Sequence, residues 1–290
     1  MLVNIFYHID EFCKSLNKQI PNLNGKNKRS RMTLSEIMTI MIYFNHSGYK
    51  TFKDYYLKHV LIHLRGEFPE LVSYTRFVEL KKYAIMPLSM FTQLGMMNQC
   101  TGLSIIDSFS IKVCHNRRIS SNKVFKDVAK RGKTSVGWFY GFKIHVIINQ
   151  VGEIIAFHMT AGNVADNNQK VLDEITKDLW GKLAGDKGYI VNNLTLEMLI
   201  SRGIQLITKV RSNMKNKLML LEDKLFLKKR GLIESTGNIL KNSLSLEHTR
   251  HRSQANFLAH ICSCIVAYFF YENKPSMNLF DPEGIYAISN

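Results

Sequence analysis

The chain has 290 residues, 46% of them hydrophobic, so it can bury a core and is not an intrinsically disordered protein. Its 39 Lys and Arg residues outnumber 23 Asp and Glu residues, and the formal net charge of +16 predicts attraction to polyanions, of which nucleic acid is the commonest. The five cysteines lack the spacing of a disulfide framework or a zinc finger, which argues against both.

Two features predict a protein inside the cell that does not enter the membrane. The segment from Met1 to Ile9 has no basic leader and no small-residue cleavage site, so no signal peptide is evident. The most apolar stretch, Phe257 to Phe270, contains His260 and is shorter than the about 20 residues that a membrane-spanning helix needs. We therefore expect a cytoplasmic protein in which this stretch forms a buried helix.

Residues 1–98 are predicted to form a helical domain. After Thr33, apolar residues recur at helical spacing at Leu34, Ile37, Met38 and Met41. The segment from Thr33 to Glu36 has the spacing of a capping box, in which the Thr hydroxyl and the Glu carboxylate each accept a backbone N–H. A basic run precedes this helix at Lys26, Lys28, Arg29 and Arg31. A helix-turn-helix that reads DNA is one interpretation, although any helical subdomain would look similar.

From residue 99 onward, strand patterns and helix patterns alternate. The predicted elements in chain order are a strand at 103–113, an alternating strand at 142–149, a turn at 150–153, a strand at 154–160, a helix after a capping box at 166–169, a strand at 183–184, a helix at 192–202, a strand at 204–210 and further helices. This order predicts the α/β class, with a mixed sheet flanked by helices in a domain of residues 99–290.

Three acidic residues occupy positions from which their carboxylates could meet. Asp107 lies in the middle of an apolar strand pattern, Asp186 follows a short strand between Gly185 and Gly188, and Glu234 lies on a predicted helix. Carboxylates are ligands for hard cations, and two metal ions about 3.5–4 Å apart can hold the attacking and leaving oxygens of a phosphodiester. Such a site needs three separate segments to converge on one edge of the sheet, which the spacing permits.

The helix predicted around Glu234 has one polar and one apolar side. At about 100° per residue, one side carries Leu227, Arg230, Glu234 and Lys241. The other side carries Leu232, Ile233, Ile239, Leu240 and Leu244. Such a helix would bury its apolar side and present a carboxylate beside two cations able to hold phosphate oxygens.

Each of these residues also has a simpler interpretation. Asp107 alone fits an edge or turn residue of a sheet, and Asp186 between glycines fits a turn residue. Arg230, Glu234 and Lys241 fit an ordinary solvated helix face with weak salt bridges. Their joint occurrence in a chain of net charge +16 favours the metal-site hypothesis.

The last of these motifs resembles that of the insertion-sequence transposases with a DDE active site. In those transposases it runs Tyr, two residues, Arg, three residues, Glu, six residues, Lys. Arg230, Glu234 and Lys241 match this spacing, and Leu227 stands at the Tyr position.

The resemblance extends over nearly the whole chain. The Ile-Asp-Ser block around Asp107 looks like the first Asp motif, and the Gly-Asp-Lys-Gly-Tyr block at 185–189 looks like the second. Together with the segments 77–87 and 247–253, these motifs make the chain similar to the insertion sequence 982 family.

This resemblance implies a ribonuclease-H-like catalytic fold and a cofactor of Mg²⁺ or Mn²⁺, with two ions held by Asp107, Asp186 and Glu234. It implies hydrolysis at the end of a mobile element, which releases a 3′-hydroxyl, and in-line attack of that hydroxyl on target DNA. The expected partners are terminal inverted repeats and target DNA. We expect a homodimer or higher oligomer on DNA, association with the bacterial nucleoid, and an N-terminal domain at 1–98 that binds the element ends.

Two basic segments, predicted as surface loops at 115–135 and 209–230, are candidates for contact with the phosphate backbone. The candidate phosphate ligands in and near them are Arg117, Arg118, Arg131, Lys133, Lys187, Arg230 and Lys241. Trp138, Phe139 and Tyr140 follow the first segment and could stack on an unpaired base, although core packing is the expected role of at least two of them. A solvated loop without DNA contact is the alternative.

A metal-dependent transposase is the leading hypothesis from the sequence. One alternative is a nuclease of the same fold that cuts DNA and does not join it. The other is a catalytically inactive DNA-binding protein.

Overall fold

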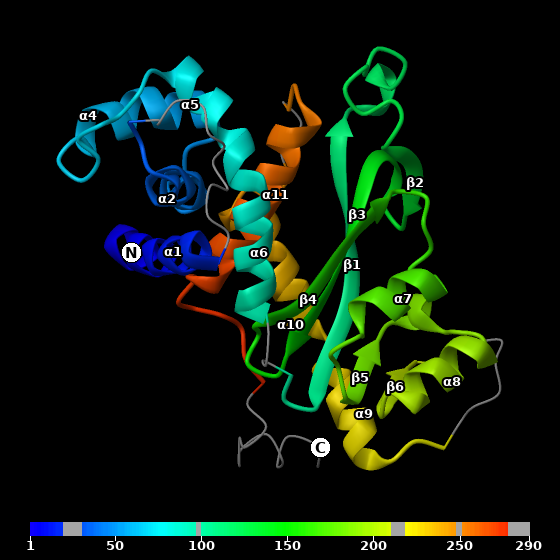
Figure 1. The fold of residues 1–290 in the computed structure, drawn as a ribbon. Helices are drawn as coiled ribbons and strands as arrows, with labels where there is room; N and C mark the ends of the chain where they lie inside the picture. Colours follow the sequence, from blue (N-terminus) through cyan, green and yellow to red (C-terminus); the bar gives the residue numbers. More distant parts are fainter. Residues whose placement is uncertain (20–30, 97–99, 210–217, 248–250, 278–290) are drawn as a thin grey trace, which may run out of the picture.

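A computed structural model describes residues 1–19, 31–96, 100–209, 218–247 and 251–277. Helices at the N-terminal end precede a curled mixed sheet, and further helices cover that sheet, as Figure 1 shows. The predicted α/β class with an N-terminal helical region is thereby confirmed.

The N-terminal region is helical, as predicted. Its helices are α1 (Leu2–Gln19), α2 (Leu34–Phe44), α3 (Phe52–Tyr55), α4 (Leu61–His63), α5 (Tyr74–Leu80) and α6 (Ile85–Met96), with a π-helical turn at Tyr56–Val60 and a 3-10 turn at Lys81–Ala84. Both bonds of the predicted capping box are present, since Glu36 N–H donates to Thr33 Oγ1 at 3.2 Å and Thr33 N–H donates to Glu36 Oε2 at 2.6 Å. The basic residues at 26, 28 and 29 lie outside the described residues.

The sheet has β1 at its centre. Its strands are β1 (Leu103–Cys114), β2 (Lys130–Thr134), β3 (Gly137–Asn149), β4 (Ile154–Ala161), β5 (Gly181–Gly185) and β6 (Ile204–Thr208). β1 pairs antiparallel with β3 on one side and parallel with β5 on the other, and β6 continues the sheet beyond β5. β2 and β4 follow one another along the outer edge of β3. This arrangement places β1 and the end of β5 side by side (Figure 1).

Helices after the hairpins complete the fold. They are α7 (Gln169–Ile175), α8 (Asn193–Ser201), α9 (Leu221–Lys228), α10 (Gly231–Asn238) and α11 (Gln254–Phe269), with 3-10 turns at Asn116–Arg118 and Lys187–Tyr189 and a π-helical turn at Ile239–Ser243. The buried helix predicted for Phe257 to Phe270 corresponds to α11, in which His260 is 5% exposed.

The long hairpin of β1 and β3 is bent at a glycine. The pairing register shifts between Lys112 and Cys114, where β1 faces Gly141. Gly141 has φ of 159°, and a Cβ atom there would lie 1.9 Å from the carbonyl oxygen of Ile111. The close approach of the two strands therefore requires glycine at this position.

Successive residues of β1 point into two apolar cores on opposite faces of the sheet, as the period of a strand requires. Ile105 lies in the larger core and Ile106 in the smaller one, which also contains residues of α7 and α8. The larger core includes Ile5 of α1, Met38 of α2 and Ile265 of α11. Helix α11 packs against both α2 and α6 (Figure 1), so the N-terminal helices share one core with the end of the chain.

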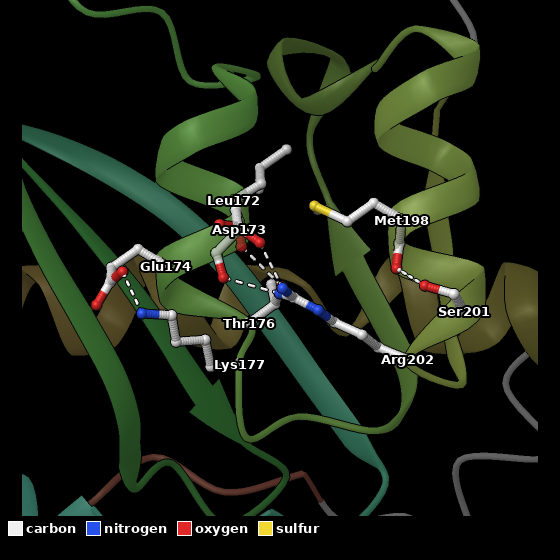
Figure 2. A network of polar contacts seen from close by, with 8 residues as sticks. All are labelled: Leu172, Asp173, Glu174, Thr176, Lys177, Met198, Ser201 and Arg202. Carbon is white, nitrogen blue, oxygen red and sulfur yellow. Dashed lines mark hydrogen bonds and ion pairs between the residues drawn. The ribbon is translucent and has the colours of Figure 1, made fainter.

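A polar network ties α7 to α8 over the smaller core, and Figure 2 shows it from close by. The guanidinium of Arg202, directly after α8, pairs with the carboxylate of Asp173. Arg202 also donates to the carbonyl oxygen of Asp173 at 2.8 Å and to Thr176 Oγ1 at 3.0 Å. Because all three acceptors come from the end of α7, one side chain fixes the position of both helices.

Candidate active site

Asp107 lies on the central strand, where the sequence pattern placed it. Val146 of β3 is its partner in the antiparallel pair, and Asp107 Oδ1 accepts the N–H of Ser108 at 2.8 Å. Asp107 is thus a residue of the central strand and not of a turn, and it lies just beyond the last residue of β1 that pairs with β5.

Asp186 is the first residue after β5. In the parallel pair Ile105 lies opposite Ala184, and the same register continued by two residues brings Asp186 beside Asp107. The side chain of Asp186 also accepts the N–H of Gly188 at 2.7 Å and begins a 3-10 turn. Asp186 is thus a turn residue and a neighbour of Asp107 at the same time.

Arg230 connects the first and third predicted carboxylates. Its Nη1 lies 3.4 Å from Asp107 Oδ2, and its Nη2 lies 2.9 Å from Glu234 Oε1. The Arg230 side chain is 22% exposed, whereas that of Glu234 is 61% exposed. The solvated face of the simpler interpretation is therefore present at Glu234, but Arg230 also reaches across to β1.

The polar face does not lie on one continuous helix. Helix α9 ends before Arg230, which precedes the first turn of α10, so Leu227 belongs to a different helix from Glu234. Leu227 is 6% exposed and lies in the larger core, so the prediction that it shares the polar side is wrong. Lys241 lies in the π-helical turn after α10, where its Nζ is 5.5 Å from the centre of the Phe109 ring.

A fourth carboxylate, Asp166, enters the site from the segment after β4. Its Oδ1 accepts from Ser108 Oγ at 2.6 Å and from Lys143 Nζ at 2.9 Å, so it contacts the residue next to Asp107. The sequence pattern assigned Asp166 to a capping box, and that prediction is wrong. Asn168 caps α7 instead, because its side chain accepts two backbone N–H groups of the first turn.

The electrostatic state of Asp107 reflects this crowding. Burial is the largest cause that raises the pKa of Asp107 to about 6, and the hydrogen bond from the Ser108 N–H acts in the opposite direction. The neighbouring carboxylates of Asp186 and Asp166 raise this pKa, whereas the charge of Arg230 lowers it. The ionised form of Asp107 is therefore disfavoured in the folded protein, and positive charge brought to this place would stabilise it.

The three predicted metal ligands lie in one region without forming a finished metal site. Across the described ranges, no three His, Cys, Asp or Glu side chains are gathered closely enough to hold a metal ion. Glu234 pairs with Arg230, and Asp186 accepts from a backbone N–H. The metal-binding roles of Asp107, Asp186 and Glu234 stay predictions.

Most predicted phosphate contacts outside α10 are exposed to solvent. These exposed residues are Arg117, Arg118, Arg131, Lys133 and Lys187. Arg131 and Lys133 lie on β2, so the prediction of a loop throughout 115–135 is wrong at its end. In the second basic segment, α9 replaces part of the predicted loop, and residues 210–217 lie outside the described residues.

Trp138 stays on the surface, while the two residues after it enter the core. Trp138 is 55% exposed, whereas Phe139 and Tyr140 are buried, as expected for two of the three aromatic residues. The Arg131 Cζ atom lies 5.5 Å and the Lys133 Nζ atom 5.6 Å from the Trp138 ring centre. An aromatic ring and two cations thus share one exposed place on the β2–β3 hairpin.

A known protein family covers the region of the chain that carries these carboxylates, namely Asp107, Asp186 and Glu234. Residues 97–254, more than half of the chain, match the transposase DDE domain family. The chain belongs to this family. Comparison with curated proteins finds no match.

Membership in the transposase DDE domain family determines the class of function. DNA is the partner, DNA cleavage in transposition is the general activity, and members of the family generally use divalent metal ions. The mixed sheet with its flanking helices is the ribonuclease-H-like fold expected from the resemblance. In the parts of the chain that the structure describes, each helix is too short or too polar to cross a membrane.

Replacing Asp107 by Asn is expected to stabilise the metal-free protein near pH 8. The raised pKa of Asp107 means that its ionisation opposes folding at pH values above about 6, and that this cost disappears as the pH falls toward the ordinary pKa of 3.8. For a carboxylate that is 25% exposed we expect a gain of about 1–2 kcal/mol in the free energy of unfolding. Denaturant unfolding in a chelating buffer at pH 8 and pH 4.5 measures it.

The matched control is Asp127→Asn, which removes an exposed carboxylate from the segment after β1. This variant should unfold like the unaltered protein at both pH values. A stability gain of Asp107→Asn that is equal at pH 8 and pH 4.5 would contradict the assignment of the effect to ionisation.

The ion pair of Lys143 and Asp166 is expected to contribute more to stability than an exposed pair. Lys143 is 12% and Asp166 29% exposed, so solvent screens their attraction weakly. A double-mutant cycle with Lys143→Met and Asp166→Ala should give a coupling energy above about 1 kcal/mol. The same cycle on Arg76 and Glu79, which are 47% and 55% exposed, should give less than about 0.5 kcal/mol. Equal couplings would refute this prediction.

Proposed function

We propose that the chain is a transposase that cuts DNA at the ends of a mobile element and joins the released end to target DNA. One observation carries the proposal: the guanidinium of Arg230 lies between the carboxylates of Asp107 and Glu234, while the end of β5 brings Asp186 beside Asp107. Three carboxylates from separate segments therefore approach one end of the β1–β5 pair, within a DDE domain.

The residues present fit Mg²⁺ or Mn²⁺ as the cofactor. Asp107 and Asp186 would hold the ions and Glu234 would complete the set, because hard divalent cations prefer carboxylate oxygens. Asp107 and Asp186 lie next to Asp166, and this concentration of negative charge suits a divalent cation. When bound, the ions supply Lewis acidity at the scissile phosphate and lower the pKa of the attacking water.

Besides pairing with Asp107 and Glu234, Arg230 would also bind the DNA phosphate. Its planar guanidinium, which reaches both carboxylates, would hold a non-bridging oxygen of the scissile phosphate. Lys187, exposed next to Asp186, and Lys241 beside Phe109 would extend the positive charge along the strand. The chain thereby binds and orients the phosphodiester that is to be broken.

The proposed reaction has two displacements at phosphorus. In the first, the oxygen of a water molecule bonds to phosphorus, and the 3′-oxygen at the element end leaves as a hydroxyl. In the second, that 3′-hydroxyl bonds to a phosphorus atom of the target strand, and a target 3′-oxygen leaves. Neither step needs a covalent bond between protein and DNA, so no Ser or Tyr nucleophile takes part.

We further propose membership of the insertion sequence 982 family, which the spacing of Arg230, Glu234 and Lys241 and the resemblance along the chain support. Residues 1–98 would bind the terminal inverted repeats, and residues 99–290 would form the catalytic domain. A homodimer or higher oligomer on DNA, associated with the bacterial nucleoid, would bring two element ends together.

Removing the charge of any triad carboxylate is expected to abolish strand cleavage and to leave DNA binding largely intact. The variants Asp107→Asn, Asp186→Asn and Glu234→Gln keep the shape of each side chain and lose the charge that the cations need. The substrate is duplex DNA from both sides of the coding sequence, where short inverted repeats are expected, and nicking is followed with Mg²⁺. Asp127→Asn is the control and should nick normally.

The same assay separates the alternatives to a transposase. A pre-nicked end that is joined to target DNA supports the transposase, whereas nicking without joining indicates a nuclease. Binding without nicking by the unaltered chain indicates a catalytically inactive DNA-binding protein. Nicking that persists in the triad variants would refute the assignment of the site.

Neutralising the exposed cations around Trp138 should weaken DNA binding in a way that depends on salt. A variant with Arg117, Arg118, Arg131 and Lys133 all replaced by Gln should bind any duplex less tightly, and each lost phosphate contact should reduce the slope of log K against log salt by about 1. The control replaces four cations by Gln that each pair with an acid three or four residues away, namely Lys14, Lys58, Arg76 and Lys177. Equal salt slopes for both variants would contradict DNA contact by the first set.

A further inference from the structure

A cavity of about 600 Å³ lies between the N-terminal helices and the start of α11, and the triad does not use it. Its walls come from α2, α3, α5, the 3-10 turn after α5 and α11. Its lining includes three aromatic residues and three cations, which are Phe44, Phe52, Tyr74, Lys53, Lys81 and Arg252. Aromatic rings and cations are therefore combined in one cavity of the size that binds small ligands.

Lys81 is the most informative residue of this cavity. Its Nζ lies 4.1 Å from the centre of the Phe52 ring, and within the described residues no carboxylate lies at ion-pair distance from it. Burial lowers the pKa of Lys81 to about 8. A partly buried ammonium that rests on an aromatic ring without an acidic partner is a place where an added anion would gain free energy.

The acid on the cavity wall does not serve as that partner. Asp54 pairs with Lys58 Nζ at 2.8 Å, and its other carboxylate oxygen accepts from Thr51 Oγ1 at 2.7 Å. Lys53 and Arg252, both exposed, stand at the cavity without an ion pair to any described acid. The charge that faces the cavity is therefore positive.

The aromatic wall is rigid and offers a flat surface. Phe52 stacks on Phe77 with ring centres 5.5 Å apart, and it also meets Phe44 edge-on at 5.2 Å. Tyr74 adds a further ring, whose pKa is raised by burial while the charge of Arg252 acts against that rise. Phe52 already carries the Lys81 ammonium over its ring and stacks on Phe77, so it holds the cation in place, and Tyr74 is the ring that a planar ligand would contact.

We propose that this cavity binds one unstacked nucleotide of a DNA strand, with its phosphate at Lys81 and Arg252 and its base against Tyr74. A planar base joined to a phosphate matches the combination of rings and cations. The strand, as opposed to a free nucleotide, is favoured because Lys53 and Arg252 add exposed charge at the cavity, where neighbouring phosphates would pass. The inference uses DNA as the partner of the family and does not depend on the triad.

The test measures the affinity for a fluorescent oligothymidine in a chelating buffer without metal. The oligothymidine has about 20 nucleotides, which is longer than the stretch of single strand that one binding domain usually covers. Lys81→Met is expected to weaken binding about 10-fold, since it removes the charged contact to one phosphate. Lys82→Met is the matched control, because Lys82 is exposed, lies 5.0 Å over the Tyr83 ring and does not line the cavity. Equal affinities of the two variants would overturn the proposal.

Photocrosslinking keeps the proposal testable if Lys81→Met folds poorly. The unaltered chain is irradiated with the same strand carrying 5-iodouracil, and the crosslinked peptide is identified by mass spectrometry. A crosslink at Tyr74 supports the proposal, and crosslinks that all lie outside the cavity overturn it. Thymidine 5′-monophosphate is the competitor: if it binds as tightly as the strand, a free nucleotide is the ligand and the proposed strand contact is wrong.

Because metal is absent, these measurements are independent of cleavage. Loss of the cavity contact leaves the triad assignment untouched, and failed nicking by the triad variants leaves the cavity contact untouched.

Discussion

A carboxylate in the middle of an apolar strand opposes folding, and the organisation of the catalytic region follows from the way the chain accommodates Asp107. Burial and the carboxylates of Asp166 and Asp186 disfavour its charge, while Arg230 and a backbone N–H favour it. Arg230 reaches Asp107 because α10 lies along the same face of β1, and that position depends on the larger core beneath it. The sheet and the core therefore hold together groups that would repel one another in water. The ionised Asp107 lowers the stability of the metal-free protein, and the divalent cations of the proposed function would restore that stability.

Successive side chains of β1 point to opposite faces of the sheet, so the contacts of Asp107 and those of Ser108 lie on different faces. Asp107 faces α10, whereas Ser108 is bonded to Asp166, which Lys143 of the neighbouring strand also contacts. The smaller core, held by Arg202 between α7 and α8, fixes the segments on the side of Asp166. Asp107 and Glu234 thus share Arg230 as a partner, whereas Asp166 is held separately by Lys143 and Ser108.

Patterns within single segments predict the helices and strands well, whereas the partners of the site residues depend on contacts between segments. The capping box at Thr33, the alternating strand before residue 149 and the buried helix at the end of the chain depend on neighbours in sequence, and all are present. The spacing of Asp166 to Gln169 predicts a helix cap, yet Lys143 and Ser108 donate to its carboxylate across the sheet. A lysine in the strand that pairs with β1 was the signal available for that contact. Helical periodicity alone reveals neither the break between α9 and α10 nor the burial of Leu227 before it.

The shared core of the N-terminal helices and α11 also constrains when the protein can become functional during its synthesis. Helices α1 and α2 leave the ribosome first, but the apolar surface that covers α2 and α6 belongs to a helix made after the whole sheet. Until α11 emerges, these early helices expose apolar surface and the cavity between them and α11 has no second wall. A nascent or truncated chain that contains every triad residue and ends before α11 would therefore lack a completed N-terminal region, so synthesis through α11 is a condition for its assembly.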